Sequence, residues 1–142
     1  MQFTPYVFFN GNCREAFEFY ATHLGGKIEA MLTHKGTPGE CQAPPDFAGK
    51  IMHGLIRLGD GALMASDCPP DMYSRPQGFS VNFQATSPEE ADRTFAALAE
   101  QGEVKMPIGP TFWATRFGMC VDRFGIPWMV NCYAESAARP AA

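Results

Sequence analysis

The feature that most constrains the fold of this chain is an internal repeat of a strand, a helix and further strands. The apolar helix residues Ala16 and Tyr20 of the first copy recur in the second copy as Ala91 and Phe95. A unit of this length cannot bury its apolar side chains by itself, so neighbouring copies of such a unit pack against each other. The repeat therefore predicts two similar halves that form one structural domain.

The first copy, residues 1–68, is predicted to be a βαβββ module. A β-rich run at 3–9 ends at Asn10-Gly11-Asn12, and apolar residues at helical spacing follow until Gly25-Gly26. Further strands are predicted at 27–34, 51–58 and 62–66, with a Pro- and Gly-rich loop at 35–49. Gly59-Asp60-Gly61 is a hairpin signal between the last two strands.

The second copy, residues 78–133, repeats this order after a predicted linker at 69–77 that contains three prolines. A strand is predicted at 79–85, and Ser87-Pro88-Glu89-Glu90 has the residues of a helix start. Strands at 104–106, 112–122 and 127–133 complete the copy, with a turn at Phe124-Gly125. Residues 134–142 are predicted to be a flexible tail.

Two such modules predict an α+β fold in which a curved mixed sheet encloses a cleft and the helices lie outside. The composition agrees, because 46% of the residues are apolar and 18% are charged, as in globular proteins. The net charge of −4 argues against a nucleic-acid partner, since nucleic-acid binding depends on cationic contacts to phosphates.

The cysteines and the N-terminal residues favour the cytoplasm. Five cysteines, Cys13, Cys41, Cys68, Cys120 and Cys132, form an odd set without a C-x-x-C pair, which is typical of reduced thiols rather than of disulfides or structural zinc. The first residues lack the basic start and long apolar run of a signal peptide. No stretch has eighteen uninterrupted apolar residues, so no membrane association is expected.

Several stretches, in order, resemble a known family. YVFFNGNCREAFEFYATHLGGKI, KIMHGLIRLGDGALMASD, QGFSVNF and above all TFWATRFGMCVDRFGIPWMVNC are similar to the PhnB-like branch of the glyoxalase/bleomycin resistance/dioxygenase superfamily, which has the vicinal oxygen chelate fold. The similarity runs from about residue 3 to residue 133. It implies tandem βαβββ modules, a small-molecule ligand and a homodimer.

The resemblance also implies where a metal would be held. Metal-dependent members place a His or Glu on the first and last strands of each module, around a divalent cation. Counting from the helices and hairpin turns puts these positions at Pro5, Met64, Ser80 and Met129, within about one residue. Divalent cations of this kind need oxygen or imidazole ligands, and a thioether suits only soft metals. We therefore expect no metal and no cofactor.

Strand alternation predicts which residues would line the cleft. Phe9 is placed with Pro5, Ser66 with Met64, and Asn131 with Met129, while Trp128 is placed on the opposite face, towards the helices. On the strand at 79–85 the polar residues Ser80 and Asn82 are expected to face the cleft. A pocket uses a few placed polar groups among apolar walls, but ordinary hydration of a sheet face explains these residues equally well.

Three further residues are candidates for ligand contact. His53 is the one histidine in the interior of a predicted strand, and it is also a weak candidate for a general base, although a partly buried structural histidine is the simpler interpretation. Trp113 has a ring that can stack on a ligand, and Arg116 has a guanidinium that can bind a carboxylate or phosphate. A structural ion pair between Arg116 and Asp122 is an equal alternative.

Two functions remain open from the sequence. The first is a metal-free binding protein that holds a small hydrophobic or amphipathic molecule, as resistance proteins of this superfamily do. The second is a lyase, isomerase or dioxygenase that uses an unrecognised metal or a metal-free base such as His53. The expected loss of the four metal ligands favours the first, without deciding whether the chain is an enzyme.

Overall fold

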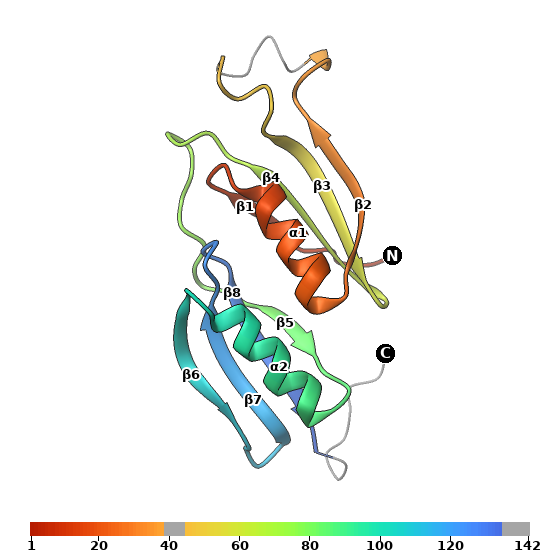
Figure 1. Cartoon of the computed structure of the whole chain (residues 1–142), viewed down its shortest axis with the longest axis vertical. Coiled ribbons are helices and arrows are strands. Elements are labelled where there is room, and N and C mark those ends of the chain that lie inside the picture. The colour runs from red at the N-terminus through yellow and green to blue at the C-terminus, as the bar shows by residue number, and fades with distance from the viewer. Residues whose placement is uncertain (39–44, 135–142) are drawn as a thin grey trace. The chain divides into compact units, whose positions relative to one another are not determined.

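The computed structural model describes residues 1–38 and 45–134, and the chain divides into two compact units, Met1–Arg75 and Pro76–Ala142. The boundary lies inside the segment 69–77 that the sequence predicts as a linker. Both units have the element order βαβββ (Figure 1). The predicted cleft between the two halves stays a prediction, and the predicted tail lies outside the described residues except for Ala134.

The first unit is a four-stranded mixed sheet with one helix. Its elements are β1 (Tyr6–Phe9), α1 (Cys13–Leu24), β2 (Lys27–Thr33), β3 (Ile51–Leu58) and β4 (Gly61–Asp67). The strands lie in the order β1-β4-β3-β2. The first strand runs parallel to β4, and the other neighbours are antiparallel.

The second unit repeats this arrangement. Its elements are β5 (Val81–Gln84), α2 (Pro88–Ala99), β6 (Glu103–Gly109), β7 (Ala114–Val121) and β8 (Pro127–Tyr133). The order β5-β8-β7-β6 is the same as in the first sheet, again with one parallel pair, β5 with β8. The predicted α+β fold of tandem βαβββ modules is thus confirmed. Pro107 is tolerated because β6 is an edge strand, where a missing N–H need not break the ladder.

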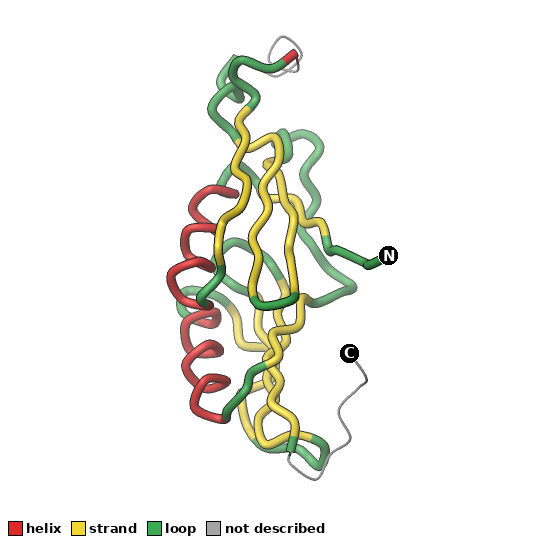
Figure 2. Tube along the Cα trace, turned by 90° about the vertical axis from the view of Figure 1, so that its right-hand side faces the viewer, coloured by secondary structure: helices red, strands yellow, loops and turns green. Residues whose placement is uncertain are grey.

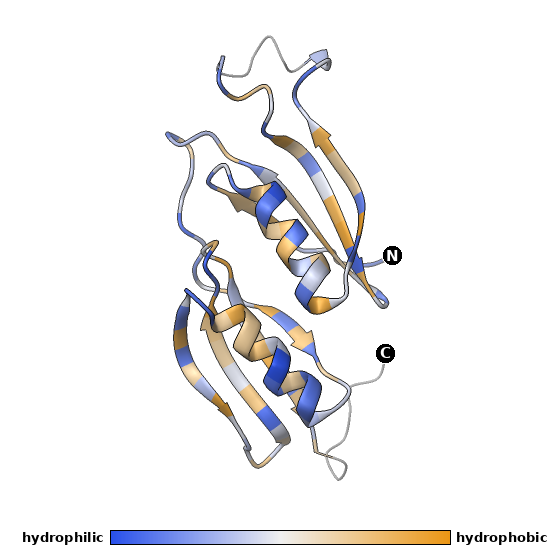
Figure 3. Ribbon diagram, in the orientation of Figure 1, coloured by the Kyte–Doolittle hydropathy of each residue, from blue (hydrophilic) through white to orange (hydrophobic). Residues whose placement is uncertain are grey.

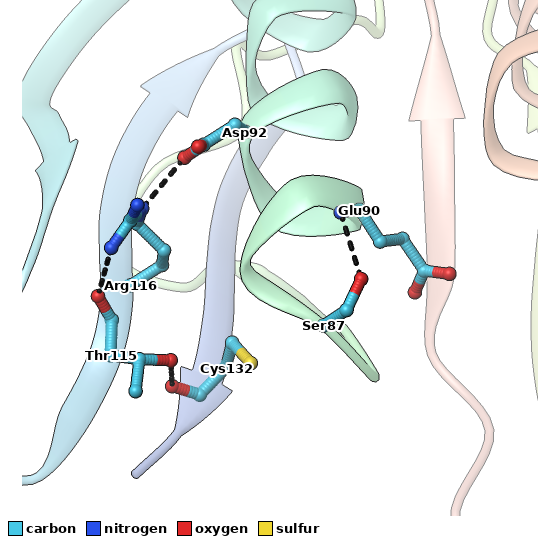
Figure 4. A network of polar contacts seen from close by, with 6 residues as sticks. All are labelled: Ser87, Glu90, Asp92, Thr115, Arg116 and Cys132. Atoms are coloured by element: carbon cyan, nitrogen blue, oxygen red, sulfur yellow. Dashed lines mark hydrogen bonds and ion pairs between the residues drawn. The ribbon is translucent and has the colours of Figure 1, made fainter.

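The two helices begin in different ways. Ser87 accepts a hydrogen bond from the Glu90 backbone N–H at 3.1 Å and so caps α2, with Pro88 in the first turn (Figure 4). The side chain of Asn12 makes no such bond to α1. Instead, the Asp67 carboxylate at the end of β4 accepts from the Cys13 backbone N–H at 2.9 Å and from that of Ile51 at 2.8 Å. A tertiary contact therefore caps the first helix.

Each helix covers one face of its own sheet (Figure 2). In the first unit, Val7, Phe9 and Ala65 are at most 2% exposed, and the Phe9 and Phe17 rings meet edge to face with centroids 6.2 Å apart. A β carbon on Gly54 would lie 3.1 Å from Cε2 of Phe17, so the glycine allows the helix to come close. This packing identifies the face of the sheet that belongs to the core.

In the second unit, α2 packs on its sheet in the same way. Phe83, Val130 and Leu98 are buried, and a β carbon on Gly118 would lie 2.8 Å from Cε2 of Phe95. Trp128 is 4% exposed and shares the face of Val130, so its predicted orientation towards the helix is confirmed. Apolar and polar residues alternate in colour along the strands, and the first turns of α2 are hydrophilic (Figure 3).

Candidate functional site

The strongest candidate surface of the first unit is the face of its sheet that is turned away from α1. We call it the helix-free face of the first sheet, and it comprises Tyr6, Phe8, Leu32, His53, Leu55, Arg57, Met64 and Ser66. The register pairs Tyr6 with Met64 and Met64 with Leu55, so these three side chains lie side by side. Tyr6 is 37% exposed and Phe8 and Leu32 are each 52% exposed, which is unusual for large apolar side chains in a sheet.

One expectation about the first strand is wrong, and another is shifted by one residue. Phe9 does not line this surface, because it is 0% exposed and packs against Phe17 of α1. Pro5 precedes β1, and its carbonyl accepts a hydrogen bond from the Met64 backbone N–H at 3.0 Å. The residue opposite Met64 is Tyr6. The alternation was assigned one residue out of phase, and the strand reads YVFF, in which no polar residue marks either face.

The most specific contact on this surface joins Tyr6 and His53. The Tyr6 hydroxyl lies 3.3 Å from Nδ1 of His53, and the two rings are stacked with centroids 5.8 Å apart. Tyr6 stands on β1 and His53 on β3, with β4 between them. Since neighbouring strands are about 4.8 Å apart, the phenol must reach across β4. A residue that the sequence analysis did not single out thus orients the candidate histidine.

The corresponding surface of the second unit is the face of its sheet turned away from α2. We call it the helix-free face of the second sheet, and it comprises Asn82, Gln84, Phe117, Met119, Met129 and Asn131. The register pairs Asn82 and Met119 with Met129, and pairs Gln84 and Phe117 with Asn131. This surface therefore combines thioethers with carboxamides.

Ser80 does not take the position expected for it, because β5 begins at Val81 and Asn82 is the residue opposite Met129. The amide nitrogen of Asn131 lies 3.5 Å from Oε1 of Gln84. Asn131 is 7% exposed, and its Oδ1 has no hydrogen-bond partner among the described residues. Asn131 thus offers an unused acceptor beside Met129.

Trp113 and Arg116 belong to different sides of the second sheet. Trp113 lies just before β7 and meets the ring of Phe117 at 5.4 Å, so it borders the helix-free face. Arg116 instead extends to α2, where its Nε donates to Asp92 at 2.9 Å, and its Nη1 donates to the Thr115 carbonyl (Figure 4). The predicted ion pair with Asp122 is wrong, because the carboxylate partner of Arg116 is Asp92, and the predicted ligand contact of Arg116 stays a prediction.

Asp122 stabilises the turn between β7 and β8. Its carboxylate accepts hydrogen bonds from the backbone N–H groups of Phe124 and Ile126 and from the indole nitrogen of Trp128. These three bonds close the turn between β7 and β8 and hold Trp128 in place. Asp122 is a structural residue, and its side chain is 4% exposed.

The residues at the family's metal positions do not fit a hard or borderline divalent cation. The cross-strand pairs there are Tyr6 with Met64 and Asn82 with Met129. Thioethers are poor ligands for such ions, and the Tyr6 hydroxyl already contacts His53. Within residues 1–38 and 45–134, no three His, Cys, Asp or Glu side chains gather closely enough to hold a metal ion.

The buried thiols are poor nucleophiles. Burial raises the pKa of the Cys13 thiol to about 12, and the nearby Asp67 carboxylate acts in the same direction. Burial and Asp122 raise the pKa of Cys120 to about 11. Since the thiolate is the reactive form, these residues are apolar packing groups at neutral pH. Cys68 is partly exposed, and Cys41 lies outside the described residues.

Sequence patterns did not single out five members of the helix-free faces: Tyr6, Phe8, Leu32, Phe117 and Met119. Leu55 alternates with His53 along a predicted strand, and this alternation alone places it on the same face. Tyr6 and Phe8 could not be placed in this way, because neighbouring positions in the same strand are equally apolar.

None of the helices in the described ranges is long and apolar enough to cross a membrane.

Comparison with known proteins gives a consistent family relationship. The model of the Glyoxalase/Bleomycin resistance protein/Dioxygenase superfamily matches residues 2–130. The chain is 33% identical over 141 residues to Protein YjdN of Escherichia coli strain K12, covering 92% of this chain and 95% of that protein. It is 52% identical in sequence to protein PA1353 from Pseudomonas aeruginosa. The crystal structure of that protein matches with a TM-score of 0.85, over 94% of this chain and 98% of that one. The PhnB protein from Bacillus cereus, 22% identical, has the same fold with a TM-score of 0.77 over 93% of this chain and 99% of that one.

Proposed function

Because the chain belongs to the Glyoxalase/Bleomycin resistance protein/Dioxygenase superfamily, we propose that it is a metal-free protein that binds a small hydrophobic or amphipathic molecule on its helix-free sheet faces. The observation that carries the proposal is the pairing of Tyr6 with Met64 and of Asn82 with Met129. These side chains are suited to an apolar ligand with a few polar groups and not to a divalent cation.

The chemistry of the two faces supports such a ligand. Methionine adapts to irregular shapes, and Met64, Met119 and Met129 contribute three thioethers. Tyr6 and Trp113 border these apolar areas with rings that can stack on a planar molecule. Asn82 and Asn131 add amides that can orient it. Binding pockets commonly have this mixture of mostly apolar walls and few polar groups.

The proposal includes a homodimer in the cytoplasm. The homodimer follows from the family resemblance. A reducing compartment is supported by Cys13, Cys68, Cys120 and Cys132, which are all free thiols. A cationic surface for nucleic acid is not expected from a chain with net charge −4.

Binding is tested with a thermal-shift screen of small metabolites and aromatic drugs on protein purified without chelator. A ligand at a hundred times its Kd adds about 2.7 kcal/mol of stability, which raises Tm by roughly 5–10 °C for a chain of this size. Met64→Lys and Met129→Lys should weaken the best hit, because each places a charge on a helix-free face. Met72→Lys is the matched control, since Met72 is 71% exposed and lies in the predicted linker.

Elemental analysis of the same preparation tests whether the protein is free of bound metal. We expect less than a tenth of an equivalent of divalent metal. A near-stoichiometric metal that survives dialysis would contradict this expectation, and hits that bind the two lysine variants as well as the natural chain would contradict the assignment to the helix-free faces.

A second candidate function is supported by the contact between Tyr6 and His53. In the tautomer whose Nδ1–H donates to the Tyr6 hydroxyl, Nε2 carries a lone pair, so His53 in that tautomer is a candidate general base for a lyase or isomerase. Turnover of a screened hit that is lost in His53→Ala, at unchanged Tm, would support this candidate. Binding without turnover would leave the binding function alone.

A further inference from the structure

The Tyr6–His53 contact engages Nδ1 of His53 and leaves Nε2 to a ligand. The Tyr6 hydroxyl lies 3.3 Å from Nδ1, and a hydroxyl that donates there requires the proton of a neutral imidazole to be on Nε2. Among the contacts of the described residues, Nε2 has no partner. With the Tyr6 hydroxyl as the donor to Nδ1, Nε2 presents an N–H donor on this face.

The surroundings of this donor are apolar. Leu32 is paired with His53 across the strands and is 52% exposed, while Leu55 and Met64 lie beside Tyr6. Tyr6 also contacts Phe8, with ring centroids 5.2 Å apart. A flat apolar molecule can cover these side chains, and burying its rings would supply most of the binding free energy.

The nearby charges do not favour a polyanion. Arg57 alternates with His53 and Leu55 on β3, but its Nε donates to the Glu29 carboxylate at 3.0 Å. Its charge is therefore already paired. A phosphate binds best to several unpaired cationic groups, and the arginine of this face is already paired with a carboxylate. The matching ligand carries an apolar ring and one acceptor oxygen.

We infer that Tyr6 and His53 form an acceptor-recognition site on the helix-free face of the first sheet, selective for planar aromatic molecules that bear a carbonyl oxygen. This inference rests on the proposed binding function and names its ligand class. The His53 Nε2–H donates to the carbonyl, and Tyr6 is a positioning residue that holds the imidazole in the required tautomer.

The test compares two probes of similar shape, acetophenone, which has a carbonyl, and ethylbenzene, which has none. Their Kd values are measured from NMR shifts of the ¹⁵N-labelled natural chain and of the variants His53→Phe and Tyr6→Phe. A hydrogen bond contributes about two- to tenfold in affinity, so the natural chain should prefer acetophenone by that factor. His53→Phe should bind both probes equally, since it keeps a ring and loses the donor.

The imidazole ¹⁵N shifts of His53 test the role of Tyr6 separately from folding. In the natural chain they should report the Nε2–H tautomer, and in Tyr6→Phe they should move towards a mixture of tautomers, with a weaker preference for acetophenone. His23→Phe is the matched control, because His23 also lies against an aromatic ring, that of Phe19 at 4.3 Å, but on α1. It should leave the preference unchanged.

The outcomes separate this inference from the proposed function. If both probes bind the natural chain with equal affinity, or if His53→Phe keeps the preference, the acceptor-recognition site is overturned while apolar binding to the face stands. If neither probe binds, the acceptor-recognition site is overturned, and the proposed binding function is decided by the thermal-shift screen. A preference for acetophenone that disappears in His53→Phe and persists in His23→Phe supports the site.

Discussion

The indole nitrogen of Trp128 donates a hydrogen bond of 2.8 Å to the carboxylate of Asp122, six residues earlier in the chain. The same carboxylate accepts from the backbone N–H groups of Phe124 and Ile126, so one buried side chain closes the β7–β8 turn and fixes the largest ring on the helix side of the second sheet. This arrangement positions the strand that carries Met129 and Asn131.

Removal of the Asp122 carboxylate should therefore be costly. Asp122→Ala leaves three donors without their acceptor in a buried turn, and we expect a loss of about 3 kcal/mol in the free energy of unfolding, measured in urea. Trp128→Phe removes one of the three bonds and should cost less. Asp60→Ala is the control, because Asp60 is exposed in the equivalent turn of the first unit. Equal stability of Asp122→Ala and Asp60→Ala would contradict the structural role.

Gly118→Ala should destabilise the second unit by overpacking. The added β carbon would lie 2.8 Å from Cε2 of Phe95 and 3.0 Å from Cα of Ile108, and such overpacking costs about 1–3 kcal/mol. Gly49→Ala is the control, since a β carbon there meets no atom within 4 Å. Thermal unfolding of the two variants gives the comparison, and a Gly118→Ala chain as stable as Gly49→Ala would mean that α2 does not pack as described.

Stability should fall in alkaline solution because of the buried thiols. The pKa of Cys13 is raised from 9.0 to about 12 and that of Cys120 to about 11, so the folded state retains protons that the unfolded state loses. The contribution of the two protonated thiols to the free energy of unfolding is fully present below pH 9. It declines as the pH rises from 9 towards 12. Urea unfolding at pH 8 and pH 10 measures the difference.

The thiols also provide a chemical check of the same burial. Iodoacetamide at pH 8 should modify the partly exposed Cys68 well before Cys13 and Cys120 in the folded chain, because the latter two are buried and protonated. Peptide mapping gives the order of modification. Modification of Cys13 or Cys120 as fast as Cys68 would show that their surroundings open readily.

Arg116→Ala should leave ligand binding unchanged. Arg116 contacts Asp92 of α2 on the side of the sheet away from Met129 and Asn131. The pair is partly exposed, and exposed ion pairs contribute about 0–1 kcal/mol, so the loss of stability should be small. Titration of a screened hit against Arg116→Ala and Asp92→Ala decides the point. Weaker binding in Arg116→Ala alone would place the guanidinium at the ligand.

The repeated βαβββ order, both helices and the hairpin turns could be predicted from local patterns. Ser87 and Pro88 mark the start of α2, and the spacing of Ala91 and Phe95 marks its apolar side. The orientation of Trp128 followed from alternation along a strand whose phase was correctly assigned. These features depend on neighbours in the chain, which is why the sequence contains them.

Some members of the candidate site could be assigned only from contacts between residues far apart in the chain. In YVFF every residue is apolar, so only the packing of Phe9 against Phe17 assigns Phe9 to the core and Tyr6 to the other face. Likewise the sequence does not show which carboxylate pairs with Arg116. The packing of α2 places the Asp92 carboxylate 2.9 Å from its Nε.

The amino-acid sequence by itself determined the repeat and the α+β class, because residue type and spacing are properties of the chain. Only the tertiary structure decided that Tyr6 reaches across β4 to His53, and that Asn82, not Ser80, lies opposite Met129. Strand register and helix docking are set by contacts between residues far apart in the chain, and a shift of one residue in register moves a side chain to the opposite face of the sheet.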